Sequence, residues 1–246
     1  MVNLMDDANK YYKEYYDELK NGAYKMENWA NTSRVLFLSE YINRNTPNGG
    51  DVLDIGCGDM HLSTILPHLS WCGVDINTDK AKGNAVAHDL MKEPYPLKEN
   101  YYDSAVCTEV LEHLWDLRVV HRQVYRALRS GGFYIISTPN FDWIDHYLSN
   151  FGQLLFDHTK PHLFEHIRQY NFSVHQRYLE ETGFKVTGYL GADAQYSQFF
   201  QGIRKTLDGF LNKRHNLNVS VGEIDQLIGM GFPLHNHTIM VTAIKE

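Results

Sequence analysis

This chain of 246 residues has few cysteines, fewer basic than acidic residues, and no long apolar run. Cys57, Cys72 and Cys107 are odd in number and show no C-x-x-C spacing, so we expect reduced core thiols rather than a disulfide framework or a zinc site. The 23 Lys and Arg residues are outnumbered by 30 Asp and Glu residues, which gives a formal net charge of -7. A broad nucleic-acid-binding surface needs a cluster of basic residues, so this charge disfavours one.

The apolar stretches are too short to span a bilayer, and residues 1–20 are charged and lack the apolar centre of a secretory signal. We therefore expect no membrane span and a cytoplasmic location. No repeat or low-complexity linker divides the chain, and its 43% hydrophobic and 22% charged residues are typical of a globular protein. The sequence predicts a single domain over residues 1–246 and indicates no oligomeric state.

The most informative stretch is residues 51–60, which read DVLDIGCGDM. Its apolar residues predict a buried strand, which ends in a D-x-G-x-G turn formed by Asp54, Gly56 and Gly58. Glycines let the backbone turn sharply and approach a ligand closely. A dinucleotide fingerprint needs a third glycine where His61 stands, so an NAD-dependent enzyme is disfavoured. An acid at the carboxyl end of a strand can instead meet the amino group of a cofactor that carries an amino acid.

Two further acids follow predicted strands. Asp75 ends the strand at residues 71–74 and lies about 20 residues after the first acid, which is the spacing of ribose-binding acids in nucleotide-binding folds. Asp89 ends an apolar stretch that begins at Val86, and it can accept a hydrogen bond from an adenine amino group while Leu90 covers the ring. Both acids can also be helix N-caps, and the glycines a tight turn. The ordered spacing favours cofactor binding by Asp75, whereas the helix N-cap is favoured for Asp89 when it is taken alone.

Residues 102–113, the R-S-G-G turn at 129–132 and the T-P-N sequence at 138–140 complete an ordered series. The series resembles the motifs of class I S-adenosylmethionine-dependent methyltransferases, and the match is close over roughly residues 35–140. The resemblance implies a Rossmann-like α/β fold: a mostly parallel seven-stranded sheet, helices on both faces and an antiparallel last strand. It implies S-adenosyl-L-methionine as cofactor, bound by Asp54, Gly56, Gly58, Asp75, Ile76, Asp89, Leu90 and Glu109.

The hydrophobic pattern alternates between strands and helices, which is typical of an α/β fold. We predict helices over residues 7–19, 31–43, 62–69, 114–128 and 173–181, and another that is opened by Ser220 and Glu223. We predict strands over residues 52–55, 71–74, 86–90, 133–137, 184–190 and 238–244, and a strand running into a helix over 102–113. Ser173 and Gln176 are predicted to form a capping box, and Gly183 to end that helix.

Three parts of the chain are predicted within the one domain. Residues 51–140 form the cofactor-binding core, and residues 1–43 supply N-terminal helices that are part of the lid or lie on the sheet. Segments 141–171 and 194–233 follow the carboxyl ends of strands, where ligands bind in open α/β sheets. We therefore predict that these two segments are lid insertions over the substrate.

A second constellation follows the fourth motif. Glu109, Glu112 and His113 lie at i, i+3 and i+4 on one face of the strand-to-helix junction, and His162 lies in the first lid segment. The set is similar to that of ubiquinone-pathway O-methyltransferases and small-RNA 2′-O-methyltransferases, where it serves as a magnesium site beside the acceptor hydroxyl. The resemblance implies that these four residues bind Mg²⁺ or Mn²⁺. Alternatively, one of the two histidines is a metal-free general base, or the glutamates line the cofactor pocket or cap the helix.

The predicted activity is O-methylation of a small-molecule hydroxyl, such as a phenol, a sugar or a polar metabolite, and this acceptor is the expected partner. A hydroxyl must lose its proton as it attacks, and Tyr170 and Tyr178 are weaker candidates for that role than a histidine. The alternatives are N-methylation of a small amine, RNA 2′-O-methylation, and a cofactor-binding subunit without catalysis. The net charge of -7 disfavours RNA, and the intact D-x-G-x-G motif with Asp75 disfavours the last.

Overall fold

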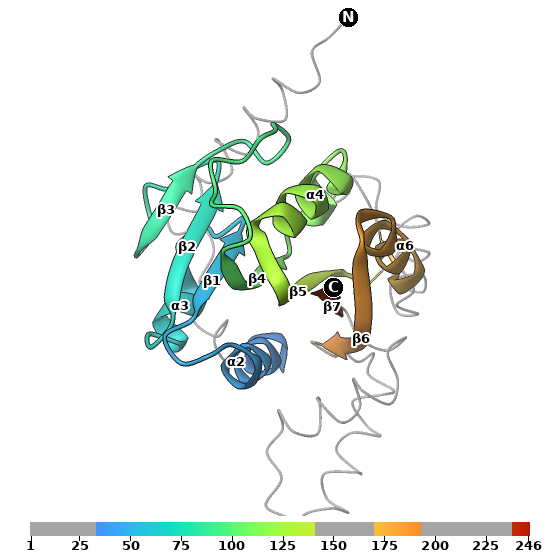
Figure 1. Cartoon of the computed structure of the whole chain (residues 1–246), viewed down its shortest axis with the longest axis horizontal. Helices are drawn as coiled ribbons and strands as arrows, with labels where there is room; N and C mark the ends of the chain where they lie inside the picture. Colours follow the sequence, from blue (N-terminus) through green and yellow to red (C-terminus); the bar gives the residue numbers. More distant parts are fainter. Residues whose placement is uncertain (1–32, 141–169, 193–237) are drawn as a thin grey trace, which may run out of the picture.

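The computed structural model describes residues 33–140, 170–192 and 238–246, which form one seven-stranded sheet with helices on both faces (Figure 1). The strand order is β3-β2-β1-β4-β5-β7-β6. The first five strands pair in parallel, whereas β7 is antiparallel to both β5 and β6. The predicted sheet is therefore confirmed, including its antiparallel last strand. The bounds are β1 Asp51–Ile55, β2 Ser70–Asp75, β3 Asn84–Ala87, β4 Tyr102–Thr108, β5 Leu128–Pro139, β6 Phe184–Ala192 and β7 Thr238–Lys245.

The central strands are apolar on both faces. Val52 and Leu53 of β1 point to opposite faces, and both are fully buried. The same holds for Val106 and Cys107 of β4. A parallel strand with helices above and below has no solvent side, so its sequence is a continuous apolar run rather than an alternating one.

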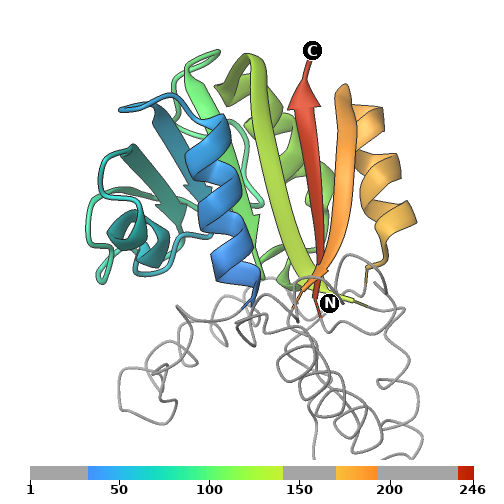
Figure 2. The same ribbon diagram turned by 90° about the horizontal axis from the view of Figure 1, so that it is seen from below.

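Helices cover the sheet in two layers. They are α2 Ser33–Asn45, α3 His61–Ile65, α4 Leu117–Ala127 and α6 Phe172–Thr182, with a short 3₁₀ helix, η2, at Leu111–His113. Figure 2 shows α2 in front of the sheet and α4 and α6 behind it. The buried side chains form two matching clusters, one with Leu38, Ile42 and Leu62 and the other with Val120, Val124 and Leu179. Each face of the sheet is thus covered by its own layer of apolar side chains.

The start of α6 differs from the prediction. Asn171, and not Ser173, is the N-cap, and its side-chain oxygen accepts a hydrogen bond from the amide of Val174 at 3.1 Å. Gln176 donates to Glu180 instead of closing a capping box. The predicted capping box is wrong because asparagine is an equally good N-cap and stands two residues earlier with an extended backbone. The predicted end at Gly183 is confirmed, since this glycine has a left-handed φ of 105°.

Lys245, in the last strand, connects β7 to the end of α4. Its ammonium group donates to the carbonyl oxygens of Tyr125 and Leu128 at 2.7 Å and to the side chain of Asn100 at 2.8 Å. The terminal carbonyls of a helix lack partners within the helix, and a cation beside them is favourable. Burial lowers the pKa of this lysine, with a smaller opposing effect from Glu99.

Several predicted bounds shift. The helix predicted at 62–69 is five residues long, His61–Ile65, and the strand predicted at 133–137 extends over Leu128–Pro139. The helices predicted over 7–19 and after Ser220 lie outside the described residues, as do nearly all of the two lid segments, so these and the division of the domain stay predictions. Among the described helices, none combines the length and apolar character needed to cross a membrane.

Candidate functional site

The D-x-G-x-G motif forms the turn after β1. Gly56 and Gly58 have φ values of 67° and 50°, which glycine adopts without a steric penalty. A Cβ atom at the first glycine would collide with the side chain of Val110. The amides of Gly56 and Cys57 both donate to the carbonyl oxygen of Val74, at 2.7 and 3.3 Å. The turn is therefore fixed between β2 and the segment after β4, and a Cβ atom at Gly58 would meet no atom of the described residues within 4 Å.

Asp75 ties the first turn to the end of β2. Its Oδ2 atom accepts a hydrogen bond from the amide of Gly58 at 2.9 Å, and its Oδ1 atom accepts one from the amide of Asn77 at 3.1 Å. Burial raises the pKa of this carboxyl, and the backbone donors oppose the rise. A carboxylate has about four lone-pair sites, so capacity for two ribose hydroxyls remains.

Asp54 lies at the same edge of the sheet, because β1 and β2 run in parallel and end together. It is buried, and burial raises the pKa of its carboxyl to about 7, with additional contributions from Asp75 and Asp59. A buried carboxylate without a cation is costly. The arrangement therefore favours a ligand that brings a positive charge, such as an ammonium group.

The loop after β3 brings the third acid to this edge. The amide of His88 donates to the carbonyl oxygen of Asp75 at 2.8 Å, which holds the loop beside β2. Asp89 accepts a hydrogen bond from the amide of Met91 at 2.9 Å, and its other oxygen lies 3.5 Å from the ammonium group of Lys92. It thus forms a local turn, and since the described residues between β3 and β4 form no helix, the predicted helix N-cap is wrong; 22% of its side chain stays exposed.

Apolar side chains flank this acid. Ile76 follows Asp75 directly and is 44% exposed, although isoleucine is usually buried. Leu90 follows Asp89 and is largely buried. Ile76 therefore leaves apolar surface exposed just beyond the carboxyl end of β2.

Glu109 follows β4 and has a left-handed backbone with φ of 53°, which is uncommon for a residue other than glycine. Its amide donates to the carbonyl oxygen of Ser137, and the hydroxyl of the same serine donates to its Oε1 atom, both at 2.9 Å. Arg34 of α2 places Nη1 at 2.9 Å from the same Oε1 atom. Strain of this kind is found at functional sites, where surrounding contacts hold it in place.

Arg34 is a site residue that the sequence did not indicate. It stands at the start of α2 outside every motif, and an ion pair across the fold leaves no local signal. Its side chain is 12% exposed, so the guanidinium brings a largely buried positive charge to the carboxyl edge of the sheet.

Glu112 is 1% exposed, and neither of its carboxyl oxygens accepts a hydrogen bond in the described part of the chain. Burial raises its pKa well above the usual range, the charge of Glu109 raises it further, and Arg34 opposes the rise. The Nε2 atom of His113 lies 3.8 Å from Oε1 of Glu112, within ion-pair range and too far for a hydrogen bond. The side chain of His113 is 26% exposed and faces partly outward.

These residues do not by themselves make a metal site. Within residues 33–140, 170–192 and 238–246, no group of three or more His, Cys, Asp and Glu side chains is arranged to hold an ion. The carboxylate of Glu109 is engaged by Arg34 and Ser137, and Glu112 favours its neutral form. His162, the fourth predicted ligand, lies outside the described residues.

The two weaker base candidates lie near α6. Tyr170 is buried beside the ring of His175, with centroids 4.9 Å apart. Tyr178 faces the guanidinium of Arg118 at 5.8 Å from its ring centroid. Both tyrosines thus make ring contacts that are typical of side-chain packing.

The family model for a methyltransferase domain matches residues 26–188. A probable S-adenosylmethionine-dependent methyltransferase of Mycolicibacterium smegmatis is 31% identical over 103 residues, 37% of this chain and 39% of that protein. A ubiquinone biosynthesis O-methyltransferase of Rickettsia prowazekii is 26% identical over 158 residues, 55% of this chain and 62% of that protein. The matched part is thus less than two thirds of each relative's length.

Solved structures agree on the fold. A crystal structure of an S-adenosylmethionine-dependent methyltransferase from Archaeoglobus fulgidus superimposes with a TM-score of 0.54 and 20% identity, over 85% of this chain and 94% of that one. The chain belongs to the class I S-adenosylmethionine-dependent methyltransferase family, with its Rossmann-like fold. The family that the ordered motifs indicated is confirmed.

Proposed function

We propose that this chain binds S-adenosylmethionine and transfers its methyl group to a hydroxyl of a small molecule. One observation carries the proposal: three acids, Asp54, Asp75 and Asp89, lie at or just beyond the carboxyl ends of three adjacent parallel strands, and the second is bonded to the glycine turn. Ligands bind at this edge of open α/β sheets. An ammonium group, a ribose and an adenine are the three parts of one cofactor that such a row of acceptors can bind.

Each acid has its own part in this proposal. Asp54 accepts from the ammonium group, Asp75 from the two ribose hydroxyls, and Asp89 from the adenine amino group. Gly56 and Gly58 let the cofactor approach the backbone. Ile76 and Leu90 sandwich the adenine ring between apolar surfaces, which the exposure of the isoleucine supports.

Arg34 supplies a partner for the carboxylate of the cofactor. Its guanidinium lies beside Glu109, and the two together offer opposite charges to a zwitterionic amino-acid end. A guanidinium binds a carboxylate through two parallel hydrogen bonds. The sulfonium between the two ends then lies in front of the β4 edge.

The proposed transfer is an in-line displacement. The acceptor oxygen forms a bond to the methyl carbon, the carbon–sulfur bond breaks, and its electron pair stays on the sulfur as a thioether. The acceptor proton passes to Nε2 of His113, which is partly exposed at this edge and lies near Glu112. Alignment on the sulfur–methyl axis supplies much of the rate, since effective molarities reach about 10⁵ M or more.

Two observations support an oxygen acceptor of small size. The Rickettsia prowazekii relative is named as an O-methyltransferase, and the net charge of -7 disfavours a polyanionic substrate. The predicted Mg²⁺ or Mn²⁺ would lower the pKa of the acceptor hydroxyl if Glu109, Glu112, His113 and His162 held it. Because the described donors suit an ion poorly, the proposed step uses His113 alone.

The test is calorimetry with S-adenosylhomocysteine. We expect binding at micromolar Kd or tighter and weaker binding by at least tenfold in Asp75→Ala, because charge-assisted hydrogen bonds contribute about 1.5–3 kcal/mol each. Arg34→Gln should weaken S-adenosylhomocysteine but not methylthioadenosine, which lacks the carboxylate. Asp79→Ala is the control: this exposed aspartate lies in the loop that follows β2, and the variant should bind S-adenosylhomocysteine as the wild type does. Tight NAD binding without S-adenosylhomocysteine binding would overturn the proposal.

A further inference from the structure

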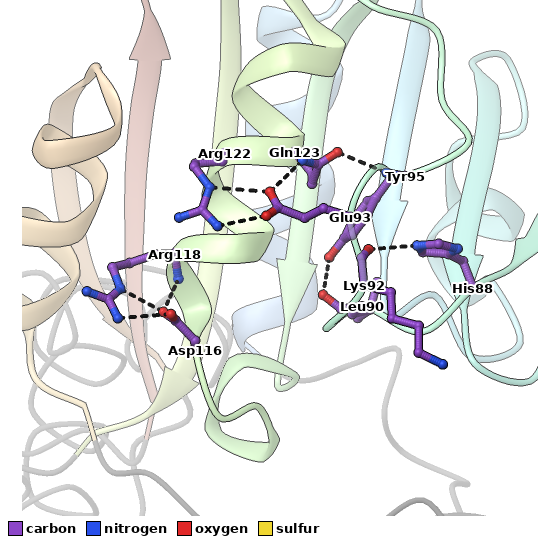
Figure 3. Close-up of polar contacts among 9 residues, drawn as sticks. All are labelled: His88, Leu90, Lys92, Glu93, Tyr95, Asp116, Arg118, Arg122 and Gln123. Atoms are coloured by element: carbon purple, nitrogen blue, oxygen red, sulfur yellow. Dashed lines mark hydrogen bonds and ion pairs between the residues drawn. The ribbon is translucent and has the colours of Figure 1, made fainter. Parts of the chain in front are cut away.

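The loop between β3 and β4 carries two of the three proposed adenine contacts, Asp89 and Leu90, yet these two residues lie in no strand or helix. Figure 3 shows side chains of α4 pointing at this loop, with the polar contacts that join them. We propose that Tyr95 and Gln123 are positioning residues that hold Asp89 and Leu90 against α4 and thereby set the selectivity for the adenine base. This inference rests on the proposed function.

The first connection is the hydroxyl of Tyr95. It donates to the carbonyl oxygen of Leu90 at 2.7 Å, and the side chain is 2% exposed. Its ring packs edge-on against His88 with centroids 5.1 Å apart. Tyr95 therefore contacts the residues on both sides of Asp89. Burial raises the pKa of the tyrosine hydroxyl, so it stays a hydrogen-bond donor.

The second connection fixes Tyr95 itself. Its amide donates to Oε1 of Gln123 on α4 at 2.9 Å, and its carbonyl oxygen accepts from Arg126 at 2.6 Å. The side chain of Gln123 also donates to Glu93 at 2.7 Å, and both nitrogens of the Arg122 fork reach the same carboxylate, at 2.9 and 3.3 Å (Figure 3). Backbone and side chain of the loop are thus bonded to one rigid helix.

The helix is a suitable reference because it is anchored in the core. Val120, Val124 and Ala127 of α4 are fully buried against the sheet. Asp116 caps its first turn by accepting from the amide of Arg118 at 3.1 Å. The position of the loop is therefore set by α4 and the core. The turn at Asp89 is connected to α4 through Leu90, Tyr95 and Gln123.

The geometry gives Tyr95 a role beyond stability. Removing its hydroxyl leaves the buried carbonyl of Leu90 without a donor, and the turn that carries Asp89 is released from α4. A displaced Asp89 no longer distinguishes an amino group, which donates to a carboxylate, from a carbonyl oxygen, which repels one. The loss falls on the base and not on the ribose or the amino-acid end.

The experiment compares S-adenosylhomocysteine with S-inosylhomocysteine, in which a carbonyl replaces the adenine amino group, by calorimetry on the full chain. Wild-type protein should prefer the adenosyl compound by about tenfold or more. Tyr95→Phe should lower this preference about threefold to tenfold, mainly by weakening the adenosyl compound. Loss of general stability alone would not change the ratio of the two dissociation constants.

Tyr101→Phe is the matched control, since this tyrosine ends the same loop, is 40% exposed and should keep the wild-type ratio. Gln123→Met removes the two bonds that Gln123 makes to the loop, with the amide of Tyr95 and with Glu93, while the tyrosine hydroxyl is kept, and it should lower the ratio too. An unchanged ratio in both Tyr95→Phe and Gln123→Met overturns the inference, as does a wild-type protein that binds both compounds equally. If wild type binds neither compound, the proposed function itself fails.

Discussion

At the scale of single residues, the candidate site is defined by carboxyl groups in unequal surroundings. Asp75 accepts two backbone hydrogen bonds, whereas Glu112 is more deeply buried and accepts none from the described residues. Burial of this kind raises the pKa of the Glu112 carboxyl and so favours its neutral form, whereas a nearby cation would favour the charged form. His113 beside it is partly exposed, with its Nε2 atom 3.8 Å from the nearer carboxyl oxygen.

The first residue-scale prediction separates the base from a metal ligand. With an acceptor in hand, His113→Gln should lower kcat by about 10² to 10⁴-fold at an unchanged cofactor Kd, because loss of a general base acts on the chemical step. Wild-type activity should persist in excess EDTA. Steady-state kinetics with and without chelator check both statements.

Titration of Mn²⁺ into the protein gives an independent control. Binding with one ion per chain in the wild type, lost in Glu112→Gln, would establish the metal site predicted from Glu109, Glu112, His113 and His162. Activity that falls to zero in EDTA and returns with Mg²⁺ or Mn²⁺ would count against His113 acting alone.

At the scale of elements, two residues near the start of α6 could each serve as its N-cap. The sequence N-F-S-V-H-Q offers Asn171 and Ser173 as caps, and both residue types are strong N-caps. The choice of Asn171 instead of Ser173 lengthens the helix by two residues at its start, so Phe172 is helical and packs against Tyr189 with ring centroids 4.3 Å apart.

We predict that Asn171→Ala lowers the free energy of unfolding by about 1 kcal/mol, because the amide of Val174 loses its partner. Ser173→Ala should change it by a few tenths of a kcal/mol at most. Urea unfolding of the two variants is the measurement. A larger loss in Ser173→Ala than in Asn171→Ala would restore the capping box.

The sequence predicted the elements whose signals are local and missed those set by tertiary pairing. The D-x-G-x-G turn and Gly183 each need a positive φ, so glycine marks them directly. The strand β5 begins five residues earlier than predicted because R-S-G-G reads as a turn, yet Leu128 pairs with Tyr102 across a register shift. The site shows the same division: the acids at the carboxyl ends of β1, β2 and β3 were predicted, whereas Arg34 and Tyr95 act through contacts that no spacing reveals.

At the scale of the whole molecule, two buried histidines join α4, α6 and β5. His121 packs edge-on against Tyr134 with centroids 5.7 Å apart, and Nε2 of His175 lies 2.8 Å from Oγ1 of Thr138. Burial lowers both pKa values to about 3; for His121 the neighbouring His175 adds to the shift and Asp116 opposes it. The folded state therefore holds both imidazoles neutral.

The sign of the pH effect follows. A histidine whose folded pKa lies below its unfolded value of about 6.5 contributes its full stability above that pH and loses it as the pH falls toward 3. Below pH 6, each of the two histidines lowers the free energy of unfolding by about 1.4 kcal/mol for every unit that the pH falls. Asp54 acts in the opposite sense, since its raised pKa of about 7 costs stability as the pH rises from 3.8 to 7.

We predict that His121→Phe flattens the fall in Tm between pH 7 and pH 5, because one protonation step linked to unfolding is removed. At pH 7 the variant should unfold at a Tm close to that of wild type, since the ring contact is kept and two ring nitrogens without hydrogen-bond partners among the described residues are lost. Calorimetric melting across this range, with the exposed His68→Phe as control, checks it. Parallel curves for wild type and His121→Phe would contradict the buried neutral state.

The antiparallel β7 also has a consequence for synthesis on the ribosome. β5 and β6 are made first but are not neighbours, because the slot between them belongs to a strand translated later. Until β7 emerges, the nascent sheet has two unpaired inner edges, and the carbonyls at the end of α4 await the ammonium group of Lys245. The early strands β1 to β4 can pair as the chain grows, whereas closure of the second half is a late event.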